Sequence, residues 1–359
     1  MNEYFELNLD ERKILKVGIQ KEITAYLNYS MPLNVFMWDE TKKNWLYEHF
    51  TNIYVIRGNE NSIWLDFLEN LYFPNDVLDY RFLNYEYMIK CDQILEYLIS
   101  KIDDAFSIML FVDKYYIESD MEYKRKHEPL QIFLYGYNKC EKNFYGIGFD
   151  KDRNYCKLEY SFEEIKRAYD SLICDLCAGY GPIWVKLYTL VMMKYIKINK
   201  PFDTSNSKIL EQIKDYYFGK KLPEKLRPEI VIERGDKAIY GINAQSEIVK
   251  ALEELYNGEF NIDYRAIHLL AEQKKLLFKK LDYMALQNNR IEKIASNFTE
   301  IYKRMEYLRK LYLITVLKES NMQNIYCKLR SKEVISLIEK EFKWIAKNEY
   351  IVLEELINL

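Results

Sequence analysis

The C-terminal third of the chain has the clearest pattern of apolar and polar positions. Residues 259–359 contain neither glycine nor proline, and their apolar residues recur at helical spacing. Two such sets are Ile267, Leu270, Leu277, Leu281 and Met284, and then Ile301, Met305, Leu308, Leu311 and Tyr312. Breaks are expected at Asn288-Asn289 and at residues 319–321. This third is therefore predicted to be a bundle of three or four helices.

The first half has shorter apolar runs separated by polar turn sequences, which is typical of strands. A helix should follow the last strand, because Ser161 and Glu164 have the spacing of a capping box. The predicted fold class is α+β: a domain of N-terminal helices and antiparallel sheet over 1–180, and a mostly helical domain over 181–359. Residues 53–57 and 63–67 are predicted to be short elements on either side of an RGNENS turn. The predicted strands are 107–112 ending at Asp113, and a meander of 130–137, 143–149 and 156–160.

The most apolar stretch, residues 183–196, reads IWVKLYTLVMMKYI and is predicted to be a buried helix. It is too short to span a bilayer, and Lys186 and Lys194 interrupt it. The first residues, MNEYFELNLDERK, are acidic and have no apolar core of a secretory signal. We therefore expect a cytoplasmic protein with reduced cysteines and no membrane partner.

Composition narrows the function classes. Hydrophobic residues make up 49% of the 359 residues and the net charge is −3, so the chain has material for a core and no basic excess that would indicate nucleic acid. With 11 glycines it contains no GxxxxGK[ST] and no GxGxxG phosphate-binding motif. Cys174 and Cys177 form a CxxC without a second ligand pair, so a thiol pair buried in a helix that ends at Gly179 is expected, and no metal site.

The segment from Asp113 to Asp150 carries the candidate chemistry. His127 precedes one predicted strand, and Asp150 follows the next strand. In a meander these two positions lie at the same edge of the sheet, so Asp150 is predicted to accept a hydrogen bond from the imidazole. That is the base and orienting carboxylate of a nucleophilic triad. The alternative is that His127 is a structural or surface residue.

The order of histidine, apolar strand, Gly136-Tyr137-Asn138 and a second strand ending in aspartate is similar to papain-like cysteine peptidases. The chain more closely resembles the proteins related to butirosin biosynthesis protein H. The segments that carry this resemblance are DKYYI at 113–117, WLDFL at 64–68 and DYRAIHLLAEQKK at 263–275. The resemblance implies a papain-like fold and transfer of acyl groups from carrier-protein thioesters in antibiotic or nonribosomal-peptide biosynthesis.

The resemblance also implies a cysteine nucleophile at the start of the first long helix, at or near position 25, where this chain has Ala25. Thr24 is the predicted N-cap of that helix. Either a homologue has lost its nucleophile, or a cysteine was replaced by alanine to trap a thioester complex. Ser30 is a possible substitute nucleophile, and Cys91 is an alternative thiol that is expected to be packed in a helix.

Two tyrosines near His127 and the other two histidines are further candidates for the site. Tyr115 and Tyr116 either pack in the core beside the strand or place a hydroxyl in an acyl pocket near His127. His268 is expected to pack against or cap a helix, and His49 has no supporting pattern.

These residues and the resemblance lead to three candidate functions. The first is an amide-forming acyltransferase that acts on an acyl or peptidyl carrier protein and a small amine acceptor. It needs no cofactor of its own, because the carrier supplies the phosphopantetheine arm. The second is a peptidase or thioesterase with the same fold. The third is a non-catalytic binding or scaffold homologue, which is consistent with the missing cysteine.

Overall fold

The computed structural model describes residues 11–57, 63–69, 77–196, 202, 204–221, 238–257, 262–319, 326–327 and 332–359. These residues fall into two compact units. The first is drawn from 1–21, 27–42 and 71–200, and the second from 22–26, 43–70 and 201–359. The predicted division after residue 180 differs from these units in three places, because residues 22–26 and 43–70 belong to the second unit and 181–200 to the first.

The first unit is built on an antiparallel sheet. Among the described residues the strand order is β4-β9-β5-β6-β7-β8, and β1 pairs with β6. The predicted meander is confirmed, since β6, β7 and β8 are consecutive neighbours. The strands are β1 (Arg12–Ile14), β4 (Leu78–Leu83), β5 (Ser107–Asp113), β6 (Pro129–Asn138), β7 (Asn143–Phe149), β8 (Tyr155–Ser161) and β9 (Leu190–Tyr195).

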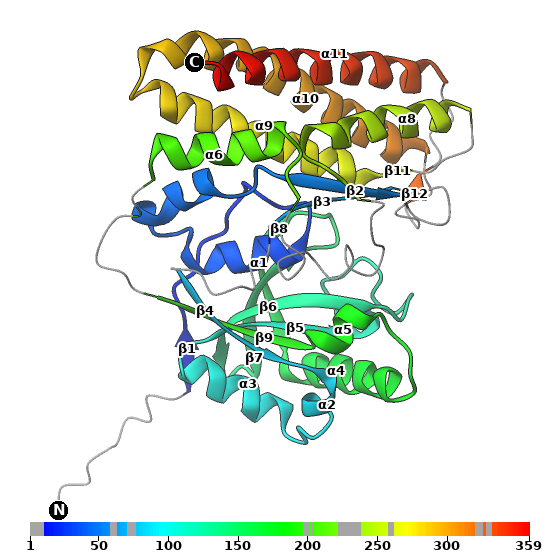
Figure 1. The fold of residues 1–359 in the computed structure, drawn as a ribbon. Coiled ribbons are helices and arrows are strands. Elements are labelled where there is room, and N and C mark those ends of the chain that lie inside the picture. Colours follow the sequence, from blue (N-terminus) through cyan, green and yellow to red (C-terminus); the bar gives the residue numbers. More distant parts are fainter. Residues whose placement is uncertain are drawn as a thin grey trace, which may run out of the picture. The chain divides into compact units, whose positions relative to one another are not determined.

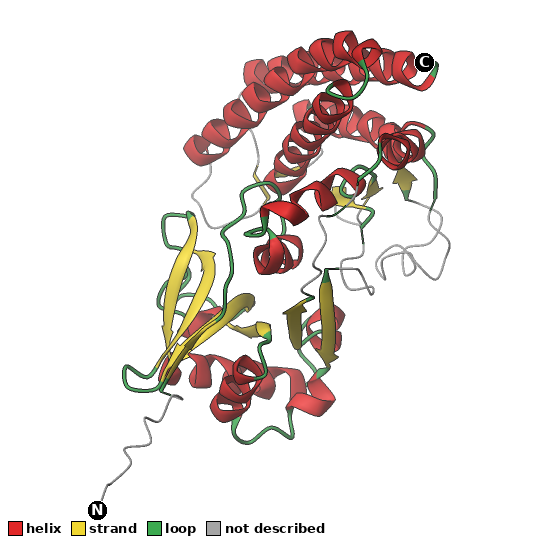
Figure 2. Ribbon diagram, turned by 90° about the vertical axis from the view of Figure 1, so that its left-hand side faces the viewer, coloured by secondary structure: helices red, strands yellow, loops and turns green. Residues whose placement is uncertain are grey.

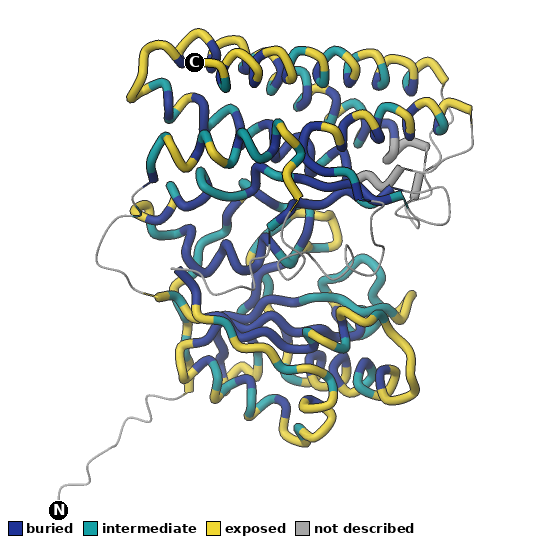
Figure 3. Tube along the Cα trace, viewed as in Figure 1, coloured by how far each residue is buried: buried dark blue, intermediate teal, exposed yellow. Residues whose placement is uncertain are grey.

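Helices α3 (Ile94–Asp103) and α4 (Phe162–Cys177) pack against this sheet (Figure 1). Figure 3 shows that buried positions run along its central strands. The predicted capping box at the start of α4 is confirmed, and Gly179 follows the helix with a φ of 91°, a conformation that favours glycine. The remaining helical segments of this unit are α1 (Leu27–Phe36), α2 (Tyr85–Met88), η2 (Lys114–Tyr116) and α5 (Ile183–Leu187).

The predicted buried helix over residues 183–196 is wrong. The segment forms the short helix α5 and then strand β9, which is hydrogen-bonded to β4 on one side and to β5 on the other. A central strand is apolar on both faces, so its residues show no alternation, and a short apolar run of this kind looks the same as a buried helix.

The second unit is mainly helical. The two short elements predicted around the RGNENS turn are strands β2 (Ile53–Arg57) and β3 (Ile63–Phe67), and these pair with each other. The turn residues 58–62 lie outside the described residues. Strand β10 (Ile239–Tyr240) joins β2, and β11 (Ile262–Asp263) pairs with β12 (Tyr326–Cys327). Its other elements are α6 (Asn206–Tyr217), η5 (Gly241–Asn243), α8 (Ala244–Tyr256), α9 (Tyr264–Ala285), α10 (Asn289–Glu319) and α11 (Lys332–Ile357); the 3-10 helix η1 (Glu40–Glu48) begins in the first unit and ends in the second.

The predicted C-terminal helices are confirmed. Helix α10 packs against both α9 and α11, which are the long helices of the second unit in Figures 1 and 2. The apolar positions singled out on α9 and α10 are buried, except that Leu311 is half-buried. The break predicted at Asn288-Asn289 separates α9 from α10. The molecule is therefore an α+β protein with a helical C-terminal region.

No helix in the described part of the chain combines the length and the apolar character needed to cross a bilayer.

Candidate functional site

The candidate site lies at the edge of the first unit's sheet where β5 ends and β6 begins. Asp113 is the last residue of β5 and pairs with Pro129, so His127 stands two residues before the facing strand position. The Nδ1 atom of His127 lies 2.6 Å from Oδ2 of Asp113. The Asp113 side chain is 2% exposed and the His127 side chain 54% exposed. A buried carboxylate thus orients an imidazole that is open to solvent.

Several donors converge on the Asp113 carboxylate. Oδ1 accepts hydrogen bonds from the backbone N–H of Tyr115 at 3.0 Å and of Glu128 at 3.3 Å. Oδ2 also accepts from the Ser171 hydroxyl of α4 at 2.7 Å. Because these donors come from three different segments, the carboxylate position is set by the fold around it. The imidazole that it holds is positioned with it.

Two tyrosines of η2 border the imidazole. The Tyr115 ring stacks on His127 with centroids 4.1 Å apart and planes 10° apart. The Tyr116 ring meets the imidazole edge-on, at 6.1 Å and 66°, and also packs against the core of the sheet. Tyr116 therefore packs against the core, as one interpretation expected, and also lies beside His127, as the other interpretation requires. Their role as substrate-binding residues stays a prediction.

His127 has a second ring nitrogen, Nε2, that forms no hydrogen bond within the described ranges. Because Nδ1 is directed at Asp113, Nε2 is the atom at which the ring can take up or release a proton. The arrangement provides a base and its orienting group. Within those ranges, no serine, threonine or cysteine donates to the imidazole as an activated nucleophile would.

The predicted hydrogen bond between His127 and Asp150 is wrong. The Asp150 carboxylate instead closes the turn between β7 and β8, where it accepts from the N–H of Asp152 at 2.9 Å and of Asn154 at 2.7 Å. These hydrogen bonds, those from Asn154 foremost, lower the pKa of Asp150. The register between β6 and β7 pairs Phe133 with Ile147, and continuing it by three residues brings Asp150 level with position 130 and not with His127.

The sequence contained a signal for the correct partner. Asp113 directly follows the buried run SIMLFV, so its carboxylate is expected to be buried too, and a buried carboxylate needs a hydrogen-bond partner. Asp150 belongs to DKDRN, whose Asp-to-Asn spacing is that of a turn. The two aspartates could have been distinguished on these grounds.

The predicted helix start at Thr24 is also wrong. Helix α1 begins at Leu27, and the Thr24 hydroxyl donates to Oε1 of Glu272 at 2.7 Å instead of capping helix amides. The Ala25 N–H donates to the other oxygen of Glu272 at 3.1 Å. Ala25 belongs to the second unit and His127 to the first. The assignment of Ala25 as the nucleophile position stays a prediction.

The other two histidines, His268 and His49, are held by contacts that do not form a catalytic arrangement. Nε2 of His268 contacts both the Thr24 hydroxyl at 2.9 Å and Glu272 at 3.1 Å. Both contacts use one ring nitrogen, so they do not form a relay in which carboxylate and hydroxyl bind opposite nitrogens. His49 stacks on Trp45 with ring centroids 3.6 Å apart.

The alternative nucleophiles are poorly placed. Ser30 is fully buried and its hydroxyl donates to the carbonyl of Leu27. Cys91 packs against the core between α2 and α3, outside the helix that was expected, and burial raises the pKa of its thiol. A raised pKa leaves less of the reactive thiolate at neutral pH.

The CxxC pair differs from expectation in its burial. Cys174 and Cys177 lie on the last turn of α4, as predicted, but both are exposed. Across the described residues, no group of three or more histidine, cysteine, aspartate or glutamate side chains is arranged to hold a metal ion.

No protein-family model matches the chain, and no curated protein sequence matches it.

Proposed function

We propose that this protein takes part in amide-forming acyl transfer, with His127 as the proton-transferring base and Asp113 as the residue that orients it. One observation carries the proposal: a solvent-open imidazole is held at 2.6 Å by a buried carboxylate. The sequence resemblance to butirosin biosynthesis protein H and its relatives supports a papain-like fold and a carrier-protein thioester as the acyl donor. The acceptor is a small amine.

The chemistry assigned to His127 is proton transfer at Nε2. An amine attacks the thioester carbonyl, the carbon–sulfur bond breaks, and the phosphopantetheine thiol leaves. His127 takes the proton from the attacking nitrogen and can return it to the leaving sulfur, while Asp113 keeps Nδ1 as the donor side of the ring. With a cysteine at position 25 the same base would first serve the thiol, and the acyl group would pass through a covalent enzyme intermediate.

The test is intact-mass spectrometry after incubation with octanoyl-loaded acyl carrier protein. Ala25→Cys should gain one octanoyl group, and the Ala25→Cys, His127→Ala double variant should not. A matched pair separates the two aspartates: adding Asp113→Asn to Ala25→Cys should slow acylation by a factor on the order of 10² to 10⁴. Adding Asp150→Asn should change the rate little.

The unmodified protein measures the background from its own thiols, including the exposed Cys174 and Cys177. Equal acylation of Ala25→Cys with and without His127 would refute the base assignment. Amide release when butylamine is added to the acylated carrier and the unmodified protein would show that the chain works without a nucleophile at position 25.

A non-catalytic binding protein is the second candidate, and a specific observation favours it. The Ala25 N–H is already bonded to the Glu272 carboxylate, and a backbone N–H at the nucleophile is a usual donor to the oxyanion of an acyl-transfer intermediate. Under this alternative the unmodified protein binds the loaded carrier and produces no amide, and Ala25→Cys stays unacylated.

A further inference from the structure

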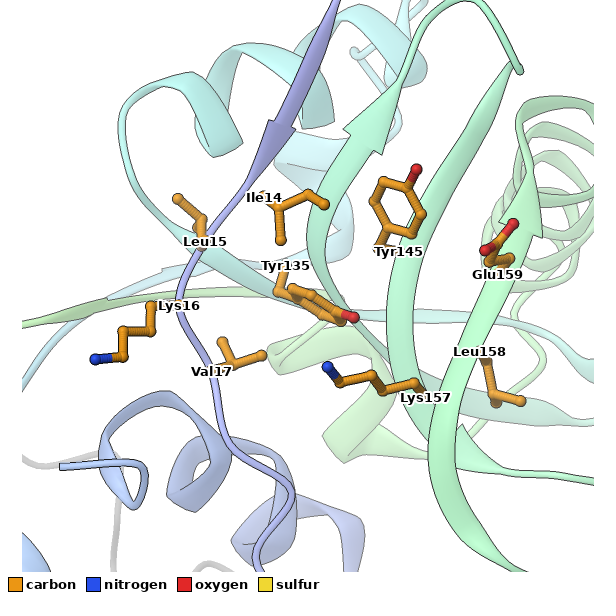
Figure 4. Close-up of a pocket in the computed structure, with 9 residues that line it drawn as sticks. All are labelled: Ile14, Leu15, Lys16, Val17, Tyr135, Tyr145, Lys157, Leu158 and Glu159. Atoms are coloured by element: carbon orange, nitrogen blue, oxygen red, sulfur yellow. The ribbon is translucent and has the colours of Figure 1, made fainter. Parts of the chain in front are cut away.

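A pocket of about 360 Å³ opens on the first unit's sheet, away from the His127 site. It is bordered by residues 14–17 and by side chains of β6, β7 and β8 (Figure 4). Tyr135, which lies in its wall, is six residues along β6 from Pro129, roughly 20 Å at the rise of an extended strand. The pocket is therefore a site separate from the proposed acyl-transfer residues.

A bulge in β6 positions the side chain that defines this pocket. Leu134 pairs with Gly146 while Gly136 pairs with Tyr145, so Tyr135 is an extra residue without a partner on β7. Its carbonyl accepts a hydrogen bond from the N–H of Leu15 at 2.8 Å. Bulges redirect side chains and are frequent beside functional sites. Here the bulge places the Tyr135 ring in the pocket wall.

Tyr135 brings an unused hydrogen-bond donor into the pocket. The residue is 5% exposed, and its hydroxyl has no hydrogen-bond partner within the described ranges. Burial above all, with the nearby Glu159 and Tyr145, raises the pKa of Tyr135, so the hydroxyl keeps its proton at neutral pH. The Tyr135 hydroxyl is not among the fully buried unpaired polar atoms of the described residues, so a ligand in the pocket can reach it.

Lys157 supplies a positive charge at the same place. Its amino group and the Tyr135 hydroxyl point into one space between residues 15–17 and β8 (Figure 4). The described residues provide no ion-pair partner for Lys157. Two other charged residues border the pocket: Glu159 accepts a hydrogen bond from Asn143 at 2.7 Å, and the Lys16 ammonium lies over the Trp38 ring at 3.8 Å.

The rest of the wall is apolar or aromatic. Ile14 and Val17 come from the end of β1 and the segment that follows it, and the Tyr145 ring lies 6.5 Å from the Tyr135 ring. The volume is near the lower end of small-molecule sites, which runs from about 300 to 1,000 Å³. We propose that this pocket binds a small aromatic carboxylate. The carboxylate bridges the Tyr135 hydroxyl and the Lys157 ammonium, and the ring lies against Tyr145 and Val17.

Benzoate is the probe for this site, measured by ligand-observed NMR titration of the full chain at neutral pH. Benzamide has the same shape without the charge, and benzylamine carries the opposite charge. Benzoate should bind at least about tenfold more tightly than either, because a hydrogen bond to a charged group contributes about that factor.

Variants locate the binding. Lys157→Gln and Tyr135→Phe should each weaken benzoate binding by about three- to tenfold, and both keep the bulk of the side chain. Lys90→Gln is the matched control, since Lys90 is an exposed lysine of the same unit outside the pocket. Thermal unfolding by circular dichroism verifies that each variant is folded.

Three outcomes would overturn the proposal. Equal affinity for benzoate and benzamide would show that the negative charge of the ligand is not recognised. Tighter binding of benzylamine than of benzoate would show that the pocket prefers a cation, with Glu159 as the residue that recognises it. Benzoate binding by Lys157→Gln and Tyr135→Phe as strong as by Lys90→Gln would place the ligand elsewhere.

Discussion

Asp113 shows how much a single buried residue determines at the candidate site. Its carboxylate accepts hydrogen bonds from the backbone of Tyr115 and Glu128 and from the side chains of His127 and Ser171. All of these groups donate hydrogen bonds to Asp113, so both side-chain oxygens of this residue must act as acceptors. An asparagine has the same shape but presents an NH₂ group on one side.

We predict that Asp113→Asn lowers the free energy of unfolding by about 1 to 3 kcal/mol, because at least one donor faces the amide NH₂ and loses its partner. The His127 ring should also lose its single tautomer, which ¹⁵N NMR of the three histidines detects directly. Urea unfolding measures the stability. Asp150→Asn is the control and should leave the His127 ring signals unchanged. Unchanged ring signals in Asp113→Asn would show that Asp113 does not orient the imidazole.

At the scale of elements, helix α9 holds the turn that leads into β2. Phe50 in this turn has a φ of 56°, which is unfavourable for a bulky side chain, and its N–H donates to Glu69 at 2.8 Å. Lys280 of α9 donates to the His49 carbonyl at 2.6 Å and to the Thr51 hydroxyl. Burial lowers the pKa of Lys280 to about 7, although the charge of Glu69 opposes this shift.

Lys280 should make the stability depend on pH. In the unfolded chain its pKa returns to about 10.4, so between pH 7 and pH 10 the unfolded state binds more protons than the folded state. The free energy of unfolding should therefore rise with pH in this window, by at most about 1.4 kcal/mol per pH unit from this group.

Urea unfolding at pH 7, 8 and 9 measures this slope, and Lys280→Met should reduce it. Lys293→Met, at an exposed position of α10, should retain the slope of the unmodified protein. Equal slopes in the two variants would mean that Lys280 stays protonated in the folded chain throughout this range.

At the scale of the molecule, a buried polar network joins helices that are far apart in the sequence. Lys274 of α9 and Glu349 of α11 form an ion pair at 2.7 Å, and both side chains are fully buried. Tyr216 of α6 and Gln245 of α8 bond to the same glutamate at 3.2 and 2.5 Å. Four helices of the second unit thus meet at one charged pair.

Removing one partner of this pair should be far more damaging than removing both. Glu349→Leu leaves an ammonium buried without its counter-charge, and we expect a loss of about 3 to 5 kcal/mol in the free energy of unfolding. The Lys274→Met, Glu349→Leu double variant should recover most of that loss. A double-mutant cycle by urea unfolding tests the coupling between the two residues. Additive effects of the two substitutions would contradict it.

Features that depend on neighbouring residues along the chain could be predicted from the sequence. The helices α9, α10 and α11 follow from helical spacing without glycine or proline, and the strands β6 to β8 follow from short apolar runs between turn signals. The capping box of Ser161 and Glu164 is likewise local. Each of these depends on residues close together in the sequence, so one segment contains the information for it.

Features that depend on a partner distant in the sequence emerged only in the folded chain. Residues 190–195 became a strand because β4 and β5 supply hydrogen bonds on both sides. His127 took Asp113 and not Asp150, because strand register determines which side chains face each other at the sheet edge. Ser171 reached the same carboxylate from α4. A hydrogen-bond partner is chosen by distance in space, and only packing of the whole unit sets that distance.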